Sequence, residues 1–523
     1  MLLQDFFAAS AARLPDKTVL VCGAARYSYS QIDAQANALG KRLQARGVQR
    51  GDRVALFLDN SVEMVAAIVA VLRIGAVFMP INALTKSDKL RFMLNDARAS
   101  ALITHAALQP VCSSALANNT SIHSCFVVAA ASGVAGTDAL ADPRCLPYAA
   151  DPAASTPGAT DPTGTAVRCA ETIDQDLAAI IYTSGSTGDP KGVMLTHLNM
   201  VSATRSISTY LGLREADIIL CALPLAFDYG LYQVLMTFAV GATLVLEASF
   251  AFPVKVLQVM VKERISVFPG VPTMFSLLMD LKTLPQYDLA AMRMITNTAA
   301  ALSQEHIRKL RALFPHATLF SMYGLTECKR VTYLPPEQLD LRPTSVGKGM
   351  PNEEVWLIDE LGNRLPNGRT GELVIRGSNV MRGYWEKPAE TAARLKPGPI
   401  PGEMILHSGD IFRTDAEGWL YFVARKDDII KSRGEKVSPR EVENVLYSLE
   451  GVLDAAVIGV ADPLLGEAIK AFIVQKAGYA LTERDVIRHC LGHLENFMAP
   501  KFVEFVADLP KTDTGKIRKT GLK

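Results

Sequence analysis

The chain has 523 residues, of which 49% are hydrophobic and 20% are charged, and its formal net charge is +1. This length exceeds what one hydrophobic core usually organises, so we expect a soluble globular protein with two to four domains or subdomains. The near balance of 54 basic and 53 acidic residues gives no electrostatic basis for nucleic acid as a partner.

The N-terminus carries no basic segment before an apolar core, and Asp5 interrupts it, so we predict no signal peptide. The most apolar segment, Val62–Met79, contains Glu63 and Arg73 and is too short for a membrane span. The eight cysteines form no CxxC pair, which argues against a zinc site and a disulfide framework. These features predict a cytoplasmic protein with reduced thiols and no integral membrane segment.

Helical and strand patterns alternate in the first part of the chain. Residues 28–48 carry apolar side chains at helical spacing, and residues 52–58 are typical of a short buried strand. Residues 61–76 predict a helix with Ser61 near its N-cap and Gly75 at its end. Such alternation predicts a parallel sheet with helices on both faces.

The remaining chain changes character four times. Residues 129–172 are rich in Ala, Gly, Pro, Ser and Thr, so we expect a long surface loop. Strand and helix patterns alternate again over residues 217–320, and short alternating strands follow from Thr344. A charged run near Asp427 precedes a small unit with its own apolar segments, which predicts a domain boundary.

The strand expected over residues 177–183 runs directly into a turn rich in glycine and hydroxyl groups, YTSGSTGDPKG. Glycines let the backbone turn tightly and present N–H groups, and Lys191 adds positive charge suited to a polyphosphate. The spacing is not that of a Walker A motif, and the segment contains no GxSxG elbow. The candidate phosphate-binding residues are Thr183, Ser184, Gly185, Ser186, Thr187, Gly188 and Lys191.

This turn resembles the phosphate loop of the adenylate-forming superfamily: acyl-CoA synthetases, peptide-synthetase adenylation domains and firefly luciferases. The resemblance covers almost the whole chain, and the other motifs occur in the expected order. It implies ATP and Mg²⁺ as cofactors. It also implies that a carboxylic acid is activated as an acyl-adenylate and passed to the thiol of CoA or of a carrier-protein phosphopantetheine. By resemblance, Thr187, Glu327 and Lys516 are the catalytic residues.

Two further motifs carry nucleotide roles by resemblance. In YGLTE, Tyr323 stacks on adenine, Thr326 contacts phosphate, and Glu327 binds Mg²⁺. An aromatic face suits a base, and a carboxylate is a hard oxygen ligand for magnesium. Asp410 in the SGD motif accepts hydrogen bonds from the ribose hydroxyls, and Arg425 is a second ribose contact.

The resemblance also implies the domain plan. Asp427 corresponds to the hinge about which family members swing the C-terminal domain, and Lys516 in the C-terminal motif stabilises charge at phosphorus. The predicted α/β protein has an N-terminal domain, residues 1–426, with two parallel-type α/β subdomains and a small β-rich subdomain. Residues 427–523 form a small mobile α+β domain.

By resemblance, the walls of the acid pocket include Phe227, Asp228, Asn297, Ala299 and Met322. If Asp228 faces the pocket, it binds the ammonium group of an amino acid. If it pairs locally instead, the pocket is apolar and suits a fatty acyl or related chain.

The sequence after YGLTE looks more like stand-alone acyl-CoA or acyl-carrier ligases than peptide-synthetase modules, and no carrier domain follows the last residue. We therefore favour a ligase for a fatty or other apolar carboxylic acid, with CoA or an acyl carrier protein as acceptor. The alternative is a stand-alone amino acid adenylation enzyme that loads a peptidyl carrier protein. A luciferase-like oxygenase and a non-catalytic nucleotide-binding relative are weaker alternatives, the latter because every chemistry-bearing motif is present.

Overall fold

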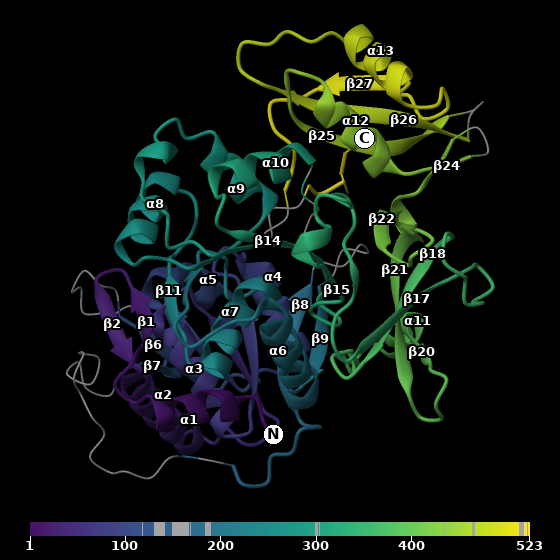
Figure 1. The fold of residues 1–523 in the computed structure, drawn as a ribbon. Helices are drawn as coiled ribbons and strands as arrows, with labels where there is room; N and C mark the ends of the chain where they lie inside the picture. The colour runs from purple at the N-terminus through teal and green to yellow at the C-terminus, as the bar shows by residue number, and fades with distance from the viewer. Residues whose placement is uncertain are drawn as a thin grey trace.

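The computed structural model describes residues 1–117, 119–129, 142–148, 167, 169–183, 190–298, 302, 304–432, 435–462, 466–511, 517–519 and 521–522. Figure 1 shows a large body formed by the first two thirds of the chain, a β-rich unit beside it, and a C-terminal unit above both. This mixed α/β architecture confirms the predicted fold class.

The first sheet of the large body has the strand order β19-β9-β8-β4-β3-β5-β6-β7, and its strands from β8 to β7 are parallel. In that order the bounds are Gly383–Tyr384, Lys191–Thr196, Leu177–Thr183, Val77–Ile81, Arg53–Phe57, Ala101–His105, Ser124–Val128 and Cys145–Pro147. The strand predicted over residues 177–183 is confirmed with the same bounds.

The second sheet has the order β16-β15-β14-β13-β12-β10-β11-β1-β2 and is parallel from β14 to β1. In that order the bounds are Lys348–Gly349, Thr332–Leu334, Thr318–Tyr323, Met294–Asn297, Val267–Gly270, Ile218–Cys221, Thr243–Leu246, Thr18–Cys22 and Ala25–Ser28. The alternation predicted over residues 217–320 is therefore confirmed.

The helices of the large body pack on these two sheets. One continuous apolar core joins both sheets with α1, α2, α3, α6 and α7, and a second core lies between the first sheet and the pair α4 and α5. The bounds are α1 Gln4–Arg13, α2 Tyr29–Ala45, α3 Val62–Arg73, α4 Ser87–Asp96, α5 Gln109–Leu116, α6 His197–Leu211, α7 Asp228–Val240, α8 Pro253–Lys262, α9 Pro272–Met279 and α10 Gln304–Leu313.

Helix α3 explains the most apolar stretch of the sequence. Its residues are buried on almost every side, so an all-round apolar pattern is what this position in the core requires. Ser61 caps the helix by accepting a hydrogen bond from the Met64 amide at 3.2 Å, and Gly75 follows it with a φ of +72°. Both predicted ends are confirmed. In the part of the chain that the structure describes, no helix has the length and hydropathy needed to cross a membrane.

The expectation of one long loop over residues 129–172 is wrong at β7. This three-residue strand pairs in parallel with β6, with Cys145 opposite Cys125. Arg144 anchors it by donating hydrogen bonds to the carbonyl oxygens of Leu116, at 3.1 Å, and Asn119, at 2.9 Å. A strand this short, at the edge of a sheet, leaves too little periodicity in the sequence to be recognised.

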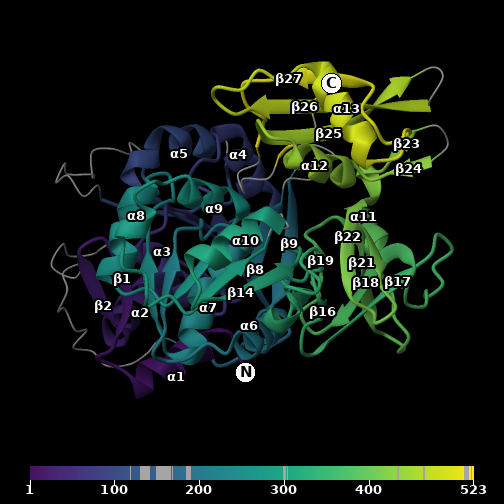
Figure 2. The same cartoon turned by 45° about the horizontal axis from the view of Figure 1, so that its top comes forward.

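The β-rich unit and the C-terminal unit follow in chain order. The first contains β17 Glu353–Ile358, β18 Thr370–Gly377, α11 Pro388–Arg394, β20 Leu395–Pro397, β21 Met404–Thr414 and β22 Leu420–Arg425. The second contains β23 Ile430–Ser432, β24 Glu435–Val437, α12 Pro439–Ser448, β25 Val452–Asp462, β26 Gly466–Gln475, α13 Glu483–His493 and β27 Phe502–Phe505. Both views place the second unit next to β22 (Figures 1 and 2).

The start of α12 rests on β22. The Ser438 hydroxyl donates to the Val423 carbonyl oxygen at 2.5 Å, and the Arg440 guanidinium lies 5.3 Å from the centre of the Phe422 ring. The short 3₁₀ turn η5, Lys426–Asp428, connects the two units. A boundary at residue 427 stays a prediction, as does the hinge role of Asp427, whose side chain lies outside the described residues.

Candidate active site

The candidate site lies at one edge of the second sheet. Strands β10, β12, β13 and β14 are parallel, so their carboxyl ends share an edge, where open α/β sheets usually bind ligands. Tyr323 is the last residue of β14, and Asn297 is the last residue of β13. Asp228 begins α7, after the loop that follows β10. The topology thus brings together residues predicted for the nucleotide and for the acid.

Three predicted nucleotide residues form one connected group. The Tyr323 hydroxyl donates to Asp410 Oδ2 at 2.5 Å, and Arg425 Nε donates to Asp410 Oδ1 at 3.4 Å. Asp410 and Arg425 lie opposite each other across β21 and β22. Burial, and then the charge of Asp410, raises the pKa of Tyr323, so this phenol keeps its proton and remains a donor.

A second group surrounds the predicted magnesium ligand. The Tyr384 hydroxyl donates to Glu327 Oε1 at 2.7 Å, and Lys191 Nζ lies 5.8 Å from the centre of the Tyr384 ring. Within the described segments, no cluster of three or more His, Cys, Asp or Glu side chains could hold a metal. One carboxylate is sufficient when the phosphates of a nucleotide supply further oxygen ligands, so Glu327 fits Mg²⁺ brought with ATP.

The phosphate turn is described only at its two ends. Thr183 and Lys191 lie opposite each other across the antiparallel strands β8 and β9, so the sheet brings the ends of the turn together. Several predicted site residues lie outside the described residues: Ser184, Gly185, Ser186, Thr187, Gly188, Ala299 and Lys516. Thr326 is partly buried in the loop after β14, beside Glu327.

Asp228 has a partner that the sequence did not predict. Its Oδ2 lies 3.5 Å from Nζ of Lys329, whose side chain is only 3% exposed. The Lys329 ammonium group also lies 4.6 Å from the centre of the Tyr232 ring. Burial lowers the pKa of Lys329 to about 7, although Asp228 opposes this shift. Of the two orientations left open for Asp228, the structure shows local pairing.

The other predicted wall residues lie close by. Phe227 is partly buried and precedes α7, and Asn297 is fully buried. Met322 is buried beside Tyr210, whose hydroxyl donates to its sulfur at 2.9 Å. The Tyr229 hydroxyl donates to the Thr296 carbonyl oxygen at 2.8 Å, which ties the start of α7 to the end of β13.

Lys329 and the neighbouring Arg330 are buried cations that sequence reasoning missed. The available signal was a pair of basic residues directly after YGLTEC, the motif that carries the predicted magnesium ligand. Cys328 lies between Glu327 and this pair; it is fully buried, and burial raises the pKa of its thiol, so it is a packed residue and not a reactive one.

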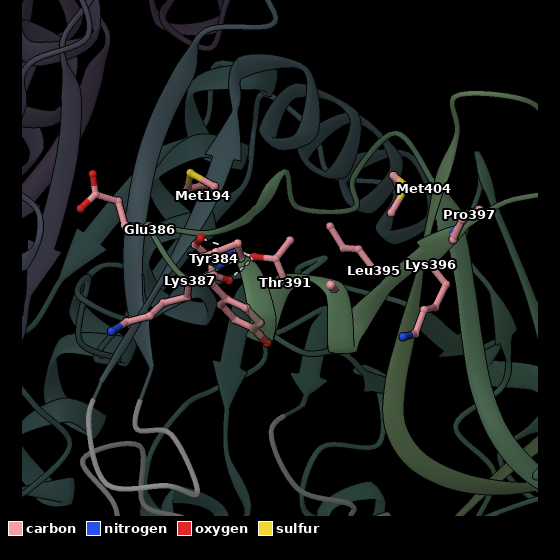
Figure 3. A pocket seen from close by; sticks show the side chains of 11 residues that line it. Met194, Tyr384, Glu386, Lys387, Thr391, Leu395, Lys396, Pro397 and Met404 are labelled. Atoms are coloured by element: carbon pink, nitrogen blue, oxygen red, sulfur yellow. Dashed lines mark hydrogen bonds between the residues drawn. The ribbon is translucent and has the colours of Figure 1, made fainter.

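A cavity of about 640 Å³ lies beside the second group (Figure 3). Tyr384 forms part of its wall, and the Tyr384 amide donates to the Thr391 hydroxyl at 2.9 Å. Its other lining residues include Met194, Leu395 and Met404. Since Phe227, Asp228, Asn297 and Met322 are not among its lining residues, it is distinct from the predicted acid pocket.

Comparison with known proteins gives consistent matches. The model of the AMP-binding enzyme family matches residues 7–385, and that of the AMP-binding enzyme C-terminal domain matches residues 441–516. A long-chain-fatty-acid–CoA ligase of Bacillus subtilis (strain 168) is 32% identical over 535 residues, which cover 98% of this chain and 93% of the relative.

The chain is also similar to a ligase for a different acid and to a solved structure. A 3-[(3aS,4S,7aS)-7a-methyl-1,5-dioxo-octahydro-1H-inden-4-yl]propanoyl:CoA ligase of Mycobacterium tuberculosis is 31% identical, covering 98% of this chain and 96% of the relative. The structure of ATP-bound MatB from Rhodopseudomonas palustris is similar with a TM-score of 0.87 at 29% identity, covering 100% of this chain and 98% of that chain.

Proposed function

The chain belongs to the AMP-binding enzyme family and is an AMP-forming acyl-CoA synthetase, and on this premise we propose that its substrate is a carboxylic acid with an apolar body and no α-ammonium group. The observation that carries this proposal is the pairing of Asp228 with Lys329. A long-chain-fatty-acid–CoA ligase among the relatives supports an apolar acid, and it supports CoA as the acceptor.

The pairing argues against an amino acid for an electrostatic reason. A substrate ammonium group at Asp228 would have to share the carboxylate with a cation 3.5 Å away, or displace it. Displacement would leave the Lys329 ammonium group buried without its counter-ion, which is strongly destabilising. Asp228 is therefore a poor ammonium receptor while Lys329 is charged.

We assign the nucleotide roles to the connected groups described above. Tyr323 supports adenine, while Asp410 and Arg425 bind the ribose hydroxyls. Lys191 and the phosphate turn hold the β- and γ-phosphates, and Glu327 orients Mg²⁺, which supplies positive charge at the phosphates.

The proposed reaction has two displacements. In the first, a carboxylate oxygen of the acid attacks the α-phosphorus of ATP, the bond to the β-phosphate oxygen breaks, and pyrophosphate leaves. Lys516 is proposed to stabilise the charge that builds on the α-phosphate. In the second, the thiolate of CoA attacks the acyl carbon, and AMP leaves with the bonding electrons.

ATP–pyrophosphate exchange with a panel of fatty acids, aryl acids and amino acids tests the substrate class, and release of free CoA thiol tests the acceptor. With apolar acids we expect both pyrophosphate exchange and consumption of CoA. With amino acids we expect neither. Exchange only with amino acids would overturn the assignment and would make a carrier-protein thiol the acceptor.

A further inference from the structure

Arg330 is a buried cation, and two of its three side-chain nitrogen atoms have no hydrogen-bond partner among the described residues. Its side chain is 1% exposed, and these two atoms are Nε and Nη1. Buried guanidinium groups are ordinarily paired, because an uncompensated buried charge is strongly destabilising. An arrangement of this kind therefore indicates a partner from outside the described residues, such as a bound molecule.

Arg330 lies beside the proposed acid pocket. Its guanidinium carbon is 5.2 Å from the centre of the Tyr229 ring, and Tyr229 directly follows Asp228 at the start of α7. The Tyr229 hydroxyl reaches the end of β13 next to Asn297. Arg330 is thus at the carboxyl edge of the sheet, on the side predicted to hold the acyl group.

The backbone leaves Arg330 little freedom to move away. A Cβ atom on Gly324 would lie 2.2 Å from the Lys329 carbonyl oxygen and 3.0 Å from the Arg330 Cα, so the loop folds closely on itself. Lys329 adopts a φ of +70°, a conformation that a non-glycine residue holds only where its surroundings enforce it. The Asn379 amide also donates to the Arg330 carbonyl oxygen at 3.2 Å.

The acidic groups around this loop do not provide the missing partner. The Asp228 carboxylate is paired with Lys329. Glu353 accepts a hydrogen bond from Asn379 at 3.3 Å and forms no ion pair with Arg330 in the described part of the chain, and burial raises the pKa of Glu353 well above its usual range. The Tyr229 ring lies next to the Arg330 guanidinium, but the Tyr229 hydroxyl donates its hydrogen bond to the Thr296 carbonyl oxygen.

We propose that Arg330 binds an oxygen atom on the acyl part of the substrate, remote from the carboxylate that is activated. The substrate is then an oxygenated carboxylic acid, with an oxo or hydroxyl group or a second carboxylate at the far end of its apolar body. This inference rests on the proposed function. A site built to hydrogen-bond a substrate oxygen rejects the analogue that lacks it far more strongly than an apolar pocket rejects a change of size.

The test compares three acids of equal chain length in ATP–pyrophosphate exchange: a plain alkanoic acid, an acid with a terminal oxo group, and a dicarboxylic acid. We expect the natural protein to favour at least one oxygenated acid over the plain acid by roughly 100-fold in kcat/KM. The variant Arg330→Met should reduce this preference to less than about tenfold, mainly by losing activity toward the oxygenated acid. Preference for the oxo acid identifies a neutral acceptor, and preference for the dicarboxylic acid identifies a carboxylate.

A second variant and a second readout separate binding from folding. Arg330→Gln keeps donors and much of the volume, so it should retain part of the preference, and Arg311→Met, on an exposed arginine, should leave preference unchanged. Without substrate, Arg330→Met should melt about 1–4 °C higher than the natural protein, since it removes an unpaired buried charge.

Three results would overturn the inference: equal use of plain and oxygenated acids by the natural protein, an equal loss on all three acids in Arg330→Met, or a lower melting temperature of that variant. Exchange with plain acids alone would leave the proposed function standing while removing this inference. Absence of exchange with every apolar and oxygenated acid would instead remove the proposed function.

Discussion

The nucleotide side and the acid side of the candidate site differ in how their polar groups are satisfied. On the nucleotide side, Tyr323, Asp410 and Arg425 are joined by hydrogen bonds, and Tyr384 donates to Glu327. On the acid side, Lys329 and Arg330 are both buried, and two nitrogen atoms of Arg330 have no hydrogen-bond partner in the described part of the chain.

This difference separates shared chemistry from substrate choice. Every AMP-forming enzyme handles the same nucleotide, so side chains that already hold one another in place without ligand suit that side of the site. The acid varies between enzymes, and an unsatisfied buried donor is a direct way to select one acid over another. Variants on the nucleotide side should therefore lower activity equally for every acid, whereas variants on the acid side should change which acid is preferred.

The largest expected effect belongs to Lys516→Ala. We expect adenylation to fall roughly 100- to 1,000-fold, because charge on the α-phosphate loses its proposed stabilising group, while thioester formation from preformed acyl-adenylate falls much less. Pyrophosphate exchange measures the first step, and CoA acylation from synthetic acyl-adenylate measures the second. Equal losses in both steps would contradict the role of Lys516.

Asp410→Asn should lower activity without changing selectivity. The neutral amide keeps the shape of the side chain but loses the charge that the Tyr323 hydroxyl and Arg425 both contact, so kcat/KM for ATP should fall roughly 10- to 100-fold. The loss should be the same for each acid, in contrast to Arg330→Met. A change in the order of preferred acids would remove the proposed separation of the two sides.

Gly324→Ala should damage both sides, because the loop that follows Gly324 carries Glu327 as well as Arg330. The added methyl group would lie 2.2 Å from a backbone oxygen, so the loop has to shift, with an expected cost of about 2–4 kcal/mol. Thermal unfolding and the three-acid exchange assay measure the two consequences. Gly492→Ala is the matched control: Gly492 lies in α13, its added methyl group would meet no atom within 4 Å, and stability should be unchanged or slightly higher.

The smallest expected effect is a pH dependence at Lys329. Burial lowers the pKa of this lysine to about 7 in the folded protein, from 10.5 in the unfolded chain. Below pH 7 both states are protonated, and the full cost of burying the charge is present. Above pH 7 the folded state loses its proton first, so the unfolded state binds more protons and stability rises with pH.

The stability of the natural protein relative to Lys329→Met should therefore increase by about 2–3 kcal/mol between pH 6 and pH 9. Melting temperatures of both proteins at the two pH values provide the measurement. The surface lysine in Lys255→Met, which is 71% exposed, is the control and should show a constant difference. A constant difference for Lys329→Met as well would mean that Lys329 keeps its charge throughout, and that Asp228 is a stronger partner than we infer.

Local sequence signals predicted much of the fold. The strand over residues 177–183, the cap at Ser61 and the glycine at position 75 each depend on neighbouring residues, and each is confirmed. The strand Cys145–Pro147 was not predicted, because three residues are too few to show the alternation of apolar and polar side chains that indicates a strand. Its place is fixed by hydrogen bonds from Arg144 to carbonyl groups more than 20 residues away.

The acid side could not be predicted in the same way. Asp228 and Lys329 are about 100 residues apart, and they meet because β10 and β14, the strands that precede them, end at the same edge of the second sheet. The sequence alone left two orientations open for Asp228. It also gave no measure of burial for Arg330, since a basic residue in a loop is ordinarily exposed to solvent.

The two-residue strand β19 has a consequence for dividing the protein into fragments. Gly383 and Tyr384 pair with β9, and the Trp385 amide donates to the Gly192 carbonyl oxygen at 2.8 Å, so a late segment covers the open side of the strand that begins at Lys191. A fragment that stops before position 383 would expose that row of backbone donors and acceptors. An exposed strand edge of this kind promotes pairing with other chains and aggregation. A useful catalytic fragment must therefore include β19, even though it lies almost 200 residues after the strand it protects.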